Sequence, residues 1–528
     1  MLTYFIIVPI LIAVLLFMLS HVKAGRAIAI LFQAGFAGAA FYLFTLSQRG
    51  EILTTIGGYE SVLGIVLRAD SVSAVFVLIT AIFFLIAAIY SFHEKDSRLF
   101  WFLMFLWQGA LVGIFLTRDL FNAFVLIEVV TIVVAILIMF NRDKRSMYDG
   151  MFYLMLNVLV IKFYLFGLGY LYRMTGTMDM EVARLALANV DSASQLLPYA
   201  LMMTSIAFKC ALLPLFSWLP KAHGSPAAPS AVSAILSGLH IKCTIYLFLR
   251  MQEMFSAVAS HEFFLVIGII TAVVGFTMAM SQSDIKLILA YSTVSQIGLI
   301  FTALSLGSYY SQIGGMYHIV NHALFKGGLF LGAGAIAKAY GTRNINQIRG
   351  VLRRYPLMGI ATLIAILGMI GAPFFNGSIS KYFMVSDTTT QMNWILTFLS
   401  LGTIITFIKY STMLFGKSDT EPKADVKIPI EQQVSTFILG ALCFVTGIFG
   451  LQSIRFLFNA TVYIDALGYL EKAGIFFASL IAGFFIFKYF VNTSDLLKRV
   501  GRFELGFRSV CVCIGVFFAA LLLTVGVL

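Results

Sequence analysis

Charged residues are scarce in this 528-residue chain, at 11% of the sequence, whereas hydrophobic residues make up 60%. A soluble domain carries roughly 25% charged and 45–50% apolar residues. Apolar runs of about 20 residues, long enough to cross a bilayer, recur along the whole chain. The composition therefore excludes a soluble domain with a single anchor and predicts an all-α, polytopic membrane protein.

Cofactor motifs are missing as well. The five cysteines lie within or beside apolar runs and form no CxxC pair, which argues against an iron–sulfur, haem or zinc framework. We interpret Cys210, Cys243, Cys443, Cys511 and Cys513 as small apolar core residues. The chain has no P-loop and no convincing dinucleotide motif, so we expect no cofactor and no redox site in this chain. Whether it is part of an oxidoreductase complex stays open.

The net charge of +12 would suggest nucleic-acid binding in a soluble protein. Here the basic residues lie mainly in short loops between apolar runs, where they set orientation. No basic stripe with interleaved aromatic residues occurs outside those runs, so we expect no nucleic-acid partner.

Sixteen apolar runs can be read from the sequence, and the first is interpreted as a retained helix because it lacks a basic n-region and a convincing cleavage site. The runs lie near 3–20, 26–47, 71–92, 99–117, 121–140, 149–173, 197–219, 227–250, 262–281, 285–306, 310–338, 357–383, 391–416, 433–453, 471–491 and 508–528. Lysine and arginine concentrate in the loops after odd-numbered runs. The positive-inside rule then places those loops in the cytoplasm and both termini outside.

Three segments between the runs are more polar. Residues 48–70 contain an alternating stretch and are predicted to form a short hairpin. Residues 338–356 are basic and are predicted to hold a short connecting piece, and residues 417–433 are too few for a domain.

Several ionisable side chains fall inside the apolar runs, where a charge costs at least about 2.5–3.5 kcal/mol. Glu128 is the sole acid of its run and is predicted to be functional. Lys162 either pairs with Glu128 for structural reasons, extends its amine to the membrane surface, or takes part in transport, and the sequence leaves these alternatives open.

Two further lysines accompany helix breaks. Pro214 follows Lys209 by five residues, and Lys381 follows a segment containing Gly371 and Pro373. Proline removes a backbone donor, and broken backbone at membrane depth is tolerated only where protein or water satisfies it. Both lysines are therefore predicted to lie at functional sites.

His318, His322 and Lys326 are spaced at i, i+4 and i+8, which places them on one helix face. Two histidines alone do not make a closed zinc site, and no glutamate lies between them as in a zinc protease. Because histidine titrates near neutral pH, a proton relay is the preferred interpretation. Lys242 is predicted to be functional, whereas a structural role stays open for His240 and Lys409.

The two interrupted runs are the seventh and the twelfth, at matching positions of two five-helix groups. We therefore predict an inverted pair of repeats at 99–250 and 262–416, since an odd number of helices reverses the second copy. Residues 1–98 would form helices 1–3, and 433–528 would form the C-terminal helices.

The segment 207–250, with Lys209, Pro214 and Trp218, resembles the proton-antiporter core of a known family. The family comprises the antiporter-like membrane subunits of respiratory NADH:quinone oxidoreductase, of membrane-bound hydrogenases and of multisubunit cation/proton (Mrp) antiporters. Segments 284–298 and 321–326 look like two further signatures. Segments 57–70 and 121–128 look most like the D-type subunit of the Mrp group and its hydrogenase relatives. The resemblance covers roughly residues 1–450.

This resemblance implies 14 core helices, here followed by about two more, with helices 7 and 12 broken. It also implies a proton-transfer axis, which by motif consists of Glu128, Lys209, Lys242, His318, His322, Lys326 and Lys381. The expected function is Na⁺/H⁺ antiport within a multisubunit complex in the inner (plasma) membrane of a prokaryote. The alternative is the pumping subunit of a redox-driven complex. Expected partners are other membrane subunits, lipid, protons and Na⁺.

Several positions depart from the family pattern. Lys221 replaces the usual acid, Lys162 occupies a position that is usually small, and Phe374 follows Pro373 where a double proline is common. Lys162 and Lys209 therefore compete as partners of Glu128. We hypothesise a switchable ion pair in which the approach of Glu128 favours the charged form of Lys209. Sodium would need oxygen ligands, and the buried acids here are few.

Overall fold

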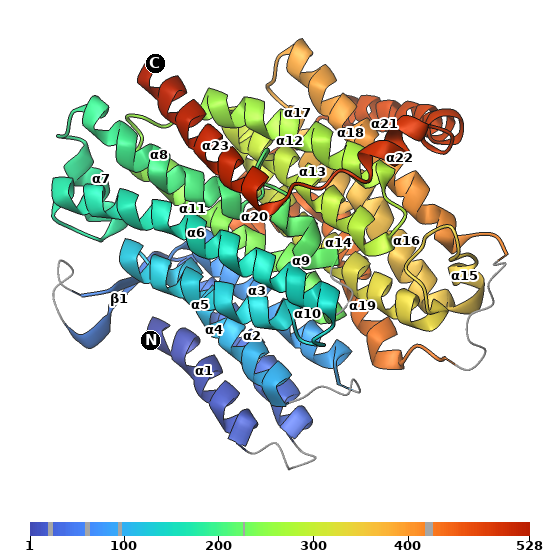
Figure 1. The fold of residues 1–528 in the computed structure, drawn as a ribbon, viewed down its shortest axis with the longest axis horizontal. Coiled ribbons are helices and arrows are strands. Elements are labelled where there is room, and N and C mark those ends of the chain that lie inside the picture. The colour runs from blue at the N-terminus through green and yellow to red at the C-terminus, as the bar shows by residue number, and fades with distance from the viewer. Residues whose placement is uncertain (19–24, 59–63, 93–97, 225–227, 418–425, 528) are drawn as a thin grey trace.

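The computed structural model describes residues 1–18, 25–58, 64–92, 98–224, 228–417 and 426–527, and it is almost entirely helical (Figure 1). Among these residues, twelve helices are long and apolar enough to cross a membrane, or thirteen if one bent pair counts as a single span. Two apolar helices, Leu2–Met18 and Pro356–Ile370, are shorter. The predicted all-α membrane architecture is confirmed, whereas the count of 14 core helices stays a prediction.

The N-terminal part combines three helices with a β-hairpin: α1 (Leu2–Met18), α2 (Gly25–Ser47), β1 (Ile52–Thr55), the 3₁₀ turn η1 (Ile56–Gly58), β2 (Val66–Ala69) and α3 (Ser71–Tyr90). The two strands pair antiparallel, with Ile52 opposite Ala69. The predicted hairpin is thus confirmed, although residues 59–63 of its connection lie outside the described residues. Asp70 caps α3 by accepting a hydrogen bond from the Ser73 N–H.

The next group contains the first helix break, between α8 and α9. Its elements are α4 (Arg98–Leu116), α5 (Leu120–Ile138), α6 (Lys144–Thr175), α7 (Met180–Leu187), α8 (Ser192–Lys209), α9 (Trp218–Gly224), α10 (Ser230–Ile235), the π-helical turn η2 (Leu236–His240) and α11 (Ile241–Met254).

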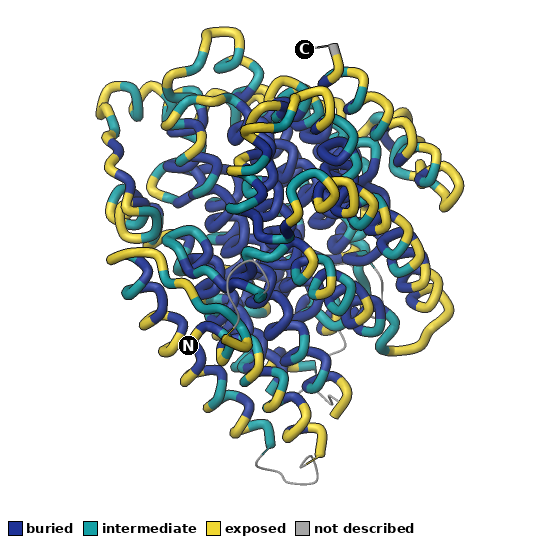
Figure 2. The backbone as a smooth tube through the Cα atoms, turned by 90° about the vertical axis from the view of Figure 1, so that its left-hand side faces the viewer, coloured by how far each residue is buried: buried dark blue, intermediate teal, exposed yellow. Residues whose placement is uncertain are grey.

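The following group contains the second break, between α16 and α17. Its elements are α12 (His261–Ser281), α13 (Ile285–Ser305), α14 (Tyr309–Tyr340), α15 (Val351–Arg354), α16 (Pro356–Ile370), α17 (Asn376–Val385), α18 (Thr390–Ser411) and the 3₁₀ turn η3 (Thr412–Leu414). The 32-residue α14 is buried along its centre, and Figure 2 shows such buried segments filling the middle of the molecule.

One backbone arrangement occurs in both groups. Asp119, before α5, bridges Asp179 after α6, and Asp284, before α13, bridges Asn344 after α14. Each partner of the second bridge follows its counterpart by 165 residues. Both α6 and α14 have 32 residues and end at a left-handed glycine. The boundaries of the predicted repeats, 99–250 and 262–416, nevertheless stay a prediction.

The C-terminal part begins with the bent pair α19 (Ile430–Ile448) and α20 (Gly450–Phe458), whose axes differ by 97°. It continues with α21 (Ala466–Ile486), the π-helical turn η4 (Phe487–Val491), α22 (Asp495–Val500) and α23 (Phe507–Val527). Helix α21 packs on α18, and α23 packs on α8. The connection between α22 and α23 therefore crosses the bundle, as Figure 1 shows in red.

Candidate functional site

The first helix break places Lys209 in the core. Helix α8 ends at Lys209, and Ala211 takes a left-handed conformation, with φ of 56°. The indole N–H of Trp218, the first residue of α9, donates to the Phe208 carbonyl at 2.8 Å and so satisfies one carbonyl at the end of α8. Lys209 itself is buried. Its amine donates to Asn157 Oδ1 at 3.0 Å and to Thr131 Oγ1 at 3.3 Å.

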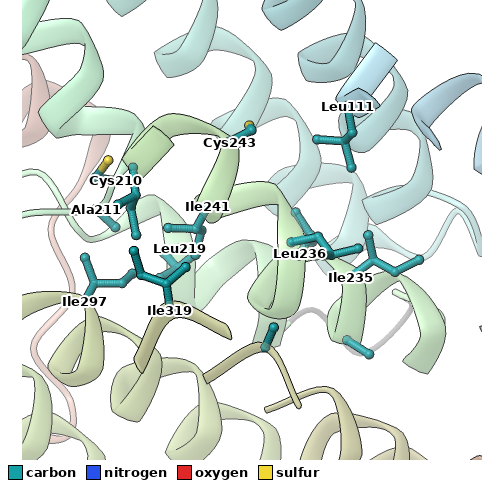
Figure 3. Close-up of a cluster of buried hydrophobic side chains, with 14 of the residues drawn as sticks. Leu111, Cys210, Ala211, Leu219, Ile235, Leu236, Ile241, Cys243, Ile297 and Ile319 are labelled. Carbon is teal, nitrogen blue, oxygen red and sulfur yellow. The ribbon is translucent and has the colours of Figure 1, made fainter. Parts of the chain in front are cut away.

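Apolar side chains close around this break (Figure 3). Cys210 and Ala211 lie at the break, near Leu219 of α9 and the isoleucines Ile297 and Ile319 of α13 and α14. Cys210, Cys243 and Cys443 are buried free thiols, and Cys511 and Cys513 are partly buried, in agreement with their interpretation as core residues. Among the described residues, no group of three or more histidine, cysteine or acidic side chains could hold a metal ion.

Glu128 pairs with Lys162 and not with Lys209. The Glu128 carboxylate lies 3.2 Å from the Lys162 amine, with exposed side-chain fractions of 20% and 46%. The Lys162 amine also lies 5.5 Å from the centre of the Phe124 ring. Thr131, a partner of Lys209, is three residues after Glu128 on α5, and so about one helical turn away. The competition expected from the sequence is therefore resolved in favour of Lys162 in this conformation.

The π-helical turn η2 ends at His240, two residues before Lys242. The His240 ring lies 3.4 Å from the Tyr153 hydroxyl, while the Lys242 amine lies 2.5 Å from His322 Nδ1. Lys242 also donates to the carbonyl of Ser237, within the π-helical turn. Such turns often occur at functional sites because they shift the backbone hydrogen-bond pattern. His240 faces away from Lys242, as its spacing predicts.

Helix α14 carries the three predicted relay residues, of which His318 and Lys326 face α13 and His322 faces α11, and all three are fully buried. Lys326 donates to the Leu289 carbonyl at 2.9 Å and to the Ser292 hydroxyl. His318 lies 2.9 Å from Gln296 on one side and 2.9 Å from Ser380 on the other. The structure therefore brings His318, His322 and Lys326 together on one helix, in contact with both helix groups.

The second break places Lys381 against the end of α16. Gly371 and Phe374 have positive φ, at 80° and 70°. The Lys381 amine donates to the Ile370 carbonyl at 3.0 Å and lies 3.4 Å from that of Met369. A cation at the carbonyl end of a helix is favoured by the helix dipole. Ser380, the neighbour of Lys381, connects this break to His318.

Lys409 lies apart from this row. Its amine donates to the carbonyls of Met280 and Gln282, both at 2.6 Å, at the end of α12. These bonds favour a structural role at the helix end over the proton-transfer role that the sequence left open.

The sequence did not predict the neutral partners of these ionisable groups, namely Thr131, Tyr153, Asn157, the carbonyl of Ser237, Ser292, Gln296 and Ser380. It also missed His223 on α9, a buried residue whose ring nitrogens have no hydrogen-bond partner in the described part of the chain. Polar residues inside apolar runs were the available signal. Asn157 and Tyr153 lie four residues apart on α6, the spacing of one helix face.

Comparisons with known proteins identify the family of this chain. Residues 117–406 match the model of the NADH:quinone oxidoreductase/Mrp antiporter transmembrane family. The chain is 28% identical to the D-type subunit of the Na⁺/H⁺ antiporter of Alkalihalophilus pseudofirmus, across 88% of this chain and 99% of the relative. It is 30% identical to the N-type subunit of the NADH-quinone oxidoreductase of Desulforudis audaxviator, across 76% and 85%.

A solved structure shares the fold. A chain of the Mrp complex from Dietzia aligns with a TM-score of 0.80 and 22% identity, covering 91% of this chain and 99% of that one.

Proposed function

Because the chain belongs to the NADH:quinone oxidoreductase/Mrp antiporter family, we propose that it moves protons as the antiporter-like subunit of a multisubunit membrane complex that exchanges Na⁺ for H⁺. One observation carries the proposal: a row of amines and imidazoles, all buried except the partly buried Lys381, lies between two helix breaks, from Lys209 to Lys381. Ionisable groups at membrane depth are costly and mark ion pathways. The similarity to the D-type subunit of an Na⁺/H⁺ antiporter, along nearly the whole length of that relative, supports sodium as the coupling ion.

Seven residues are proposed to transfer protons: Glu128, Lys209, Lys242, His318, His322, Lys326 and Lys381. Contacts join them in short groups. Lys242 meets His322, and His318 reaches the second break through Ser380. Lys162, His240 and Lys409 stay secondary candidates. We expect no cofactor in this chain and no nucleic-acid partner.

The proposed step at the first break is a change of partner by Glu128. Lys162 holds Glu128 in this conformation, and neutral Asn157 and Thr131 hold Lys209. A hydrogen bond to a charged group contributes about 1.5–3 kcal/mol, and moving one charge against 100 mV costs about 2.3 kcal/mol. A change of partner therefore has the magnitude needed to gate one proton.

The exposure of the Glu128–Lys162 pair supports the proposal that a neighbouring subunit covers this face. Lys162 is 46% exposed within a span, and a charge facing lipid is unfavourable. A partner subunit or water at this face would remove that cost. We propose the inner membrane of a prokaryote as the location, with both termini outside and two inverted repeats at 99–250 and 262–416.

The alternative function is ion pumping in a redox-driven complex, and the similarity to the N-type subunit of an NADH-quinone oxidoreductase favours it. The two functions differ in their driving force. Antiport requires only a cation gradient, whereas pumping requires an electron donor and redox subunits.

The test uses inverted membrane vesicles that contain the assembled complex. Adding Na⁺ should release an imposed proton gradient in wild type, and Glu128→Gln and Lys209→Ala should abolish this release at normal chain abundance. Wild-type release in either variant would refute the proposed axis. Proton movement that appears only with NADH or another electron donor would establish the alternative.

A further inference from the structure

A cavity of about 420 Å³ lies on the side of the bundle where the loops after odd-numbered runs meet. It is large enough for on the order of ten water molecules. Its walls come from α6, α9 and α13, and from residues 501–505 of the C-terminal connection between α22 and α23. This connection crosses the bundle in Figure 1, and its Gly501 carbonyl accepts a hydrogen bond from Gln282 at 3.1 Å.

Glu504 of this connection holds two basic residues of the core. Its carboxylate lies 3.3 Å from the Lys221 amine and 3.5 Å from the Arg145 guanidinium. Lys221 follows the first helix break and is only 8% exposed. Its amine also faces the rings of Phe152 and Tyr148, at 4.3 and 5.3 Å. A buried ammonium needs a counter-charge, and a C-terminal residue supplies it here.

The cavity is electrically balanced only when Glu504 is included. Three basic residues line it, as do three carboxylates. Arg343 pairs with Asp284 at 2.6 Å, and Arg145 pairs with Asp149 at 3.4 Å. Without Glu504 the cavity would carry one excess positive charge, which would repel an entering cation.

A polar row on α6 leads from this cavity toward Lys209. Asp149 lines the cavity, and Tyr153 and Asn157 follow at intervals of four residues, on the same helix face. The Asn157 side-chain amide donates to the backbone carbonyl of Tyr153 at 2.8 Å, and its oxygen accepts a hydrogen bond from the Lys209 amine at 3.0 Å. The row therefore ends at the lysine of the first break.

We propose that Glu504 is a positioning residue for proton entry: it balances the charge of the cavity at the head of the row Asp149–Tyr153–Asn157, along which protons reach Lys209. The inference rests on the proposed function, but it concerns a residue outside the buried axis. The ionisable groups that face Glu504 and the cavity are Lys221, Arg145, Asp149, Asp284, Arg343 and Tyr291.

The test compares two single variants of opposite sign. Removing a charge that lies about 7 Å from an entering proton, in a cavity filled with water, changes the energy of that proton by an amount that corresponds to about a three- to tenfold change in the local proton concentration. Glu504→Gln should therefore raise the apparent KM for protons on the cavity side by about three- to tenfold with kcat preserved, and Lys221→Gln should lower it. The double variant Lys221→Gln/Glu504→Gln restores the net charge and should return KM to near wild type.

The control is Asp495→Asn on α22, which removes an exposed ion pair with Lys498 in the same C-terminal part. It should leave KM unchanged. If Glu504→Gln and Lys221→Gln both reduce kcat or abundance and neither shifts KM, the ion pair is only structural and the inference is wrong. If Glu504→Gln is wild type while Lys209→Ala is inactive, the inference fails and the proposed function stands. Inactivity of wild type in every ion gradient would instead refute the proposed function.

Discussion

Replacing Asn157 by leucine tests whether a neutral side chain controls the proton on Lys209. The asparagine oxygen lies 3.0 Å from the Lys209 amine and the Thr131 hydroxyl 3.3 Å from it. Asn157→Leu removes the shorter of these two bonds and leaves a buried amine with one side-chain acceptor. A hydrogen bond to a charged group contributes about 1.5–3 kcal/mol, and about 1.4 kcal/mol corresponds to a factor of ten. The protonated form of Lys209 should therefore become about 10- to 100-fold less accessible.

The assay is Na⁺-induced proton release from inverted vesicles, with the rate divided by the amount of chain in the membrane. Asn157→Leu should lower this rate about 10- to 100-fold while assembly is kept. Thr131→Val, which removes the longer bond, should lower it less. A wild-type rate in Asn157→Leu would show that Lys209 does not depend on this partner. Equal loss in both variants would contradict the ranking by distance.

Three further predictions follow from contacts outside this pair. Burial alone raises the pKa of the Asp70 carboxyl, but Arg250, the Ser73 N–H and Arg68 together outweigh it and hold the pKa below 3.8. A carboxyl whose pKa is lower in the folded than in the unfolded state stabilises the protein above the unfolded pKa, and this stabilisation is lost as pH falls through the folded pKa. Asp70→Asn should therefore destabilise the detergent-solubilised protein by about 3 kcal/mol at pH 7. The difference in Tm between Asp70→Asn and wild type should shrink below about pH 4. Lys381→Met should abolish proton release in vesicles at normal abundance, because it removes the amine that caps the Ile370 carbonyl; a wild-type rate would exclude Lys381 from the axis. Tyr469→Phe removes the hydroxyl that binds the Phe374 N–H at 3.2 Å and Ser378 at 2.8 Å, so it should lower thermal stability by about 1–2 kcal/mol, and an unchanged Tm would show that α21 does not support the second break.

Much of the fold could be predicted because membrane helices are fixed by local composition. Each of the sixteen apolar runs corresponds to one helix or to one interrupted helix in the described residues. Both breaks were predicted from Pro214, Gly371 and Pro373, whose backbone constraints act within a few residues. The bend of 97° between α19 and α20 was not predicted. It occurs in an apolar run without proline, beside Gly447 and Gly450.

The candidate site could be predicted only for its charged members, because a charge in an apolar run is visible without knowledge of its neighbours. Its neutral partners are distant in sequence: Lys209 lies 52 residues from Asn157 and 78 from Thr131. The partner of Glu128 could not be predicted either, since Lys162 and Lys209 both satisfy the sequence rule. Glu504 lies 283 residues from Lys221. It also lies in a polar connection, where an acidic residue is common and predicts no function.

The way in which three lysines of the row are held explains why the chain can place several amines beside so few acids. Lys242, Lys326 and Lys381 all donate to backbone carbonyls, at the π-helical turn, at α13 and at the second break. A carbonyl accepts a hydrogen bond from an ammonium and leaves no uncompensated negative charge when the proton departs. A carboxylate would be left as a buried, unpaired charge, which is strongly unfavourable. Backbone carbonyls therefore let these three amines gain or lose a proton without leaving an opposite charge unpaired. Glu128 is the one carboxylate among the seven proposed residues. It has a half-exposed partner, Lys162, with which it can pair again when it leaves Lys209.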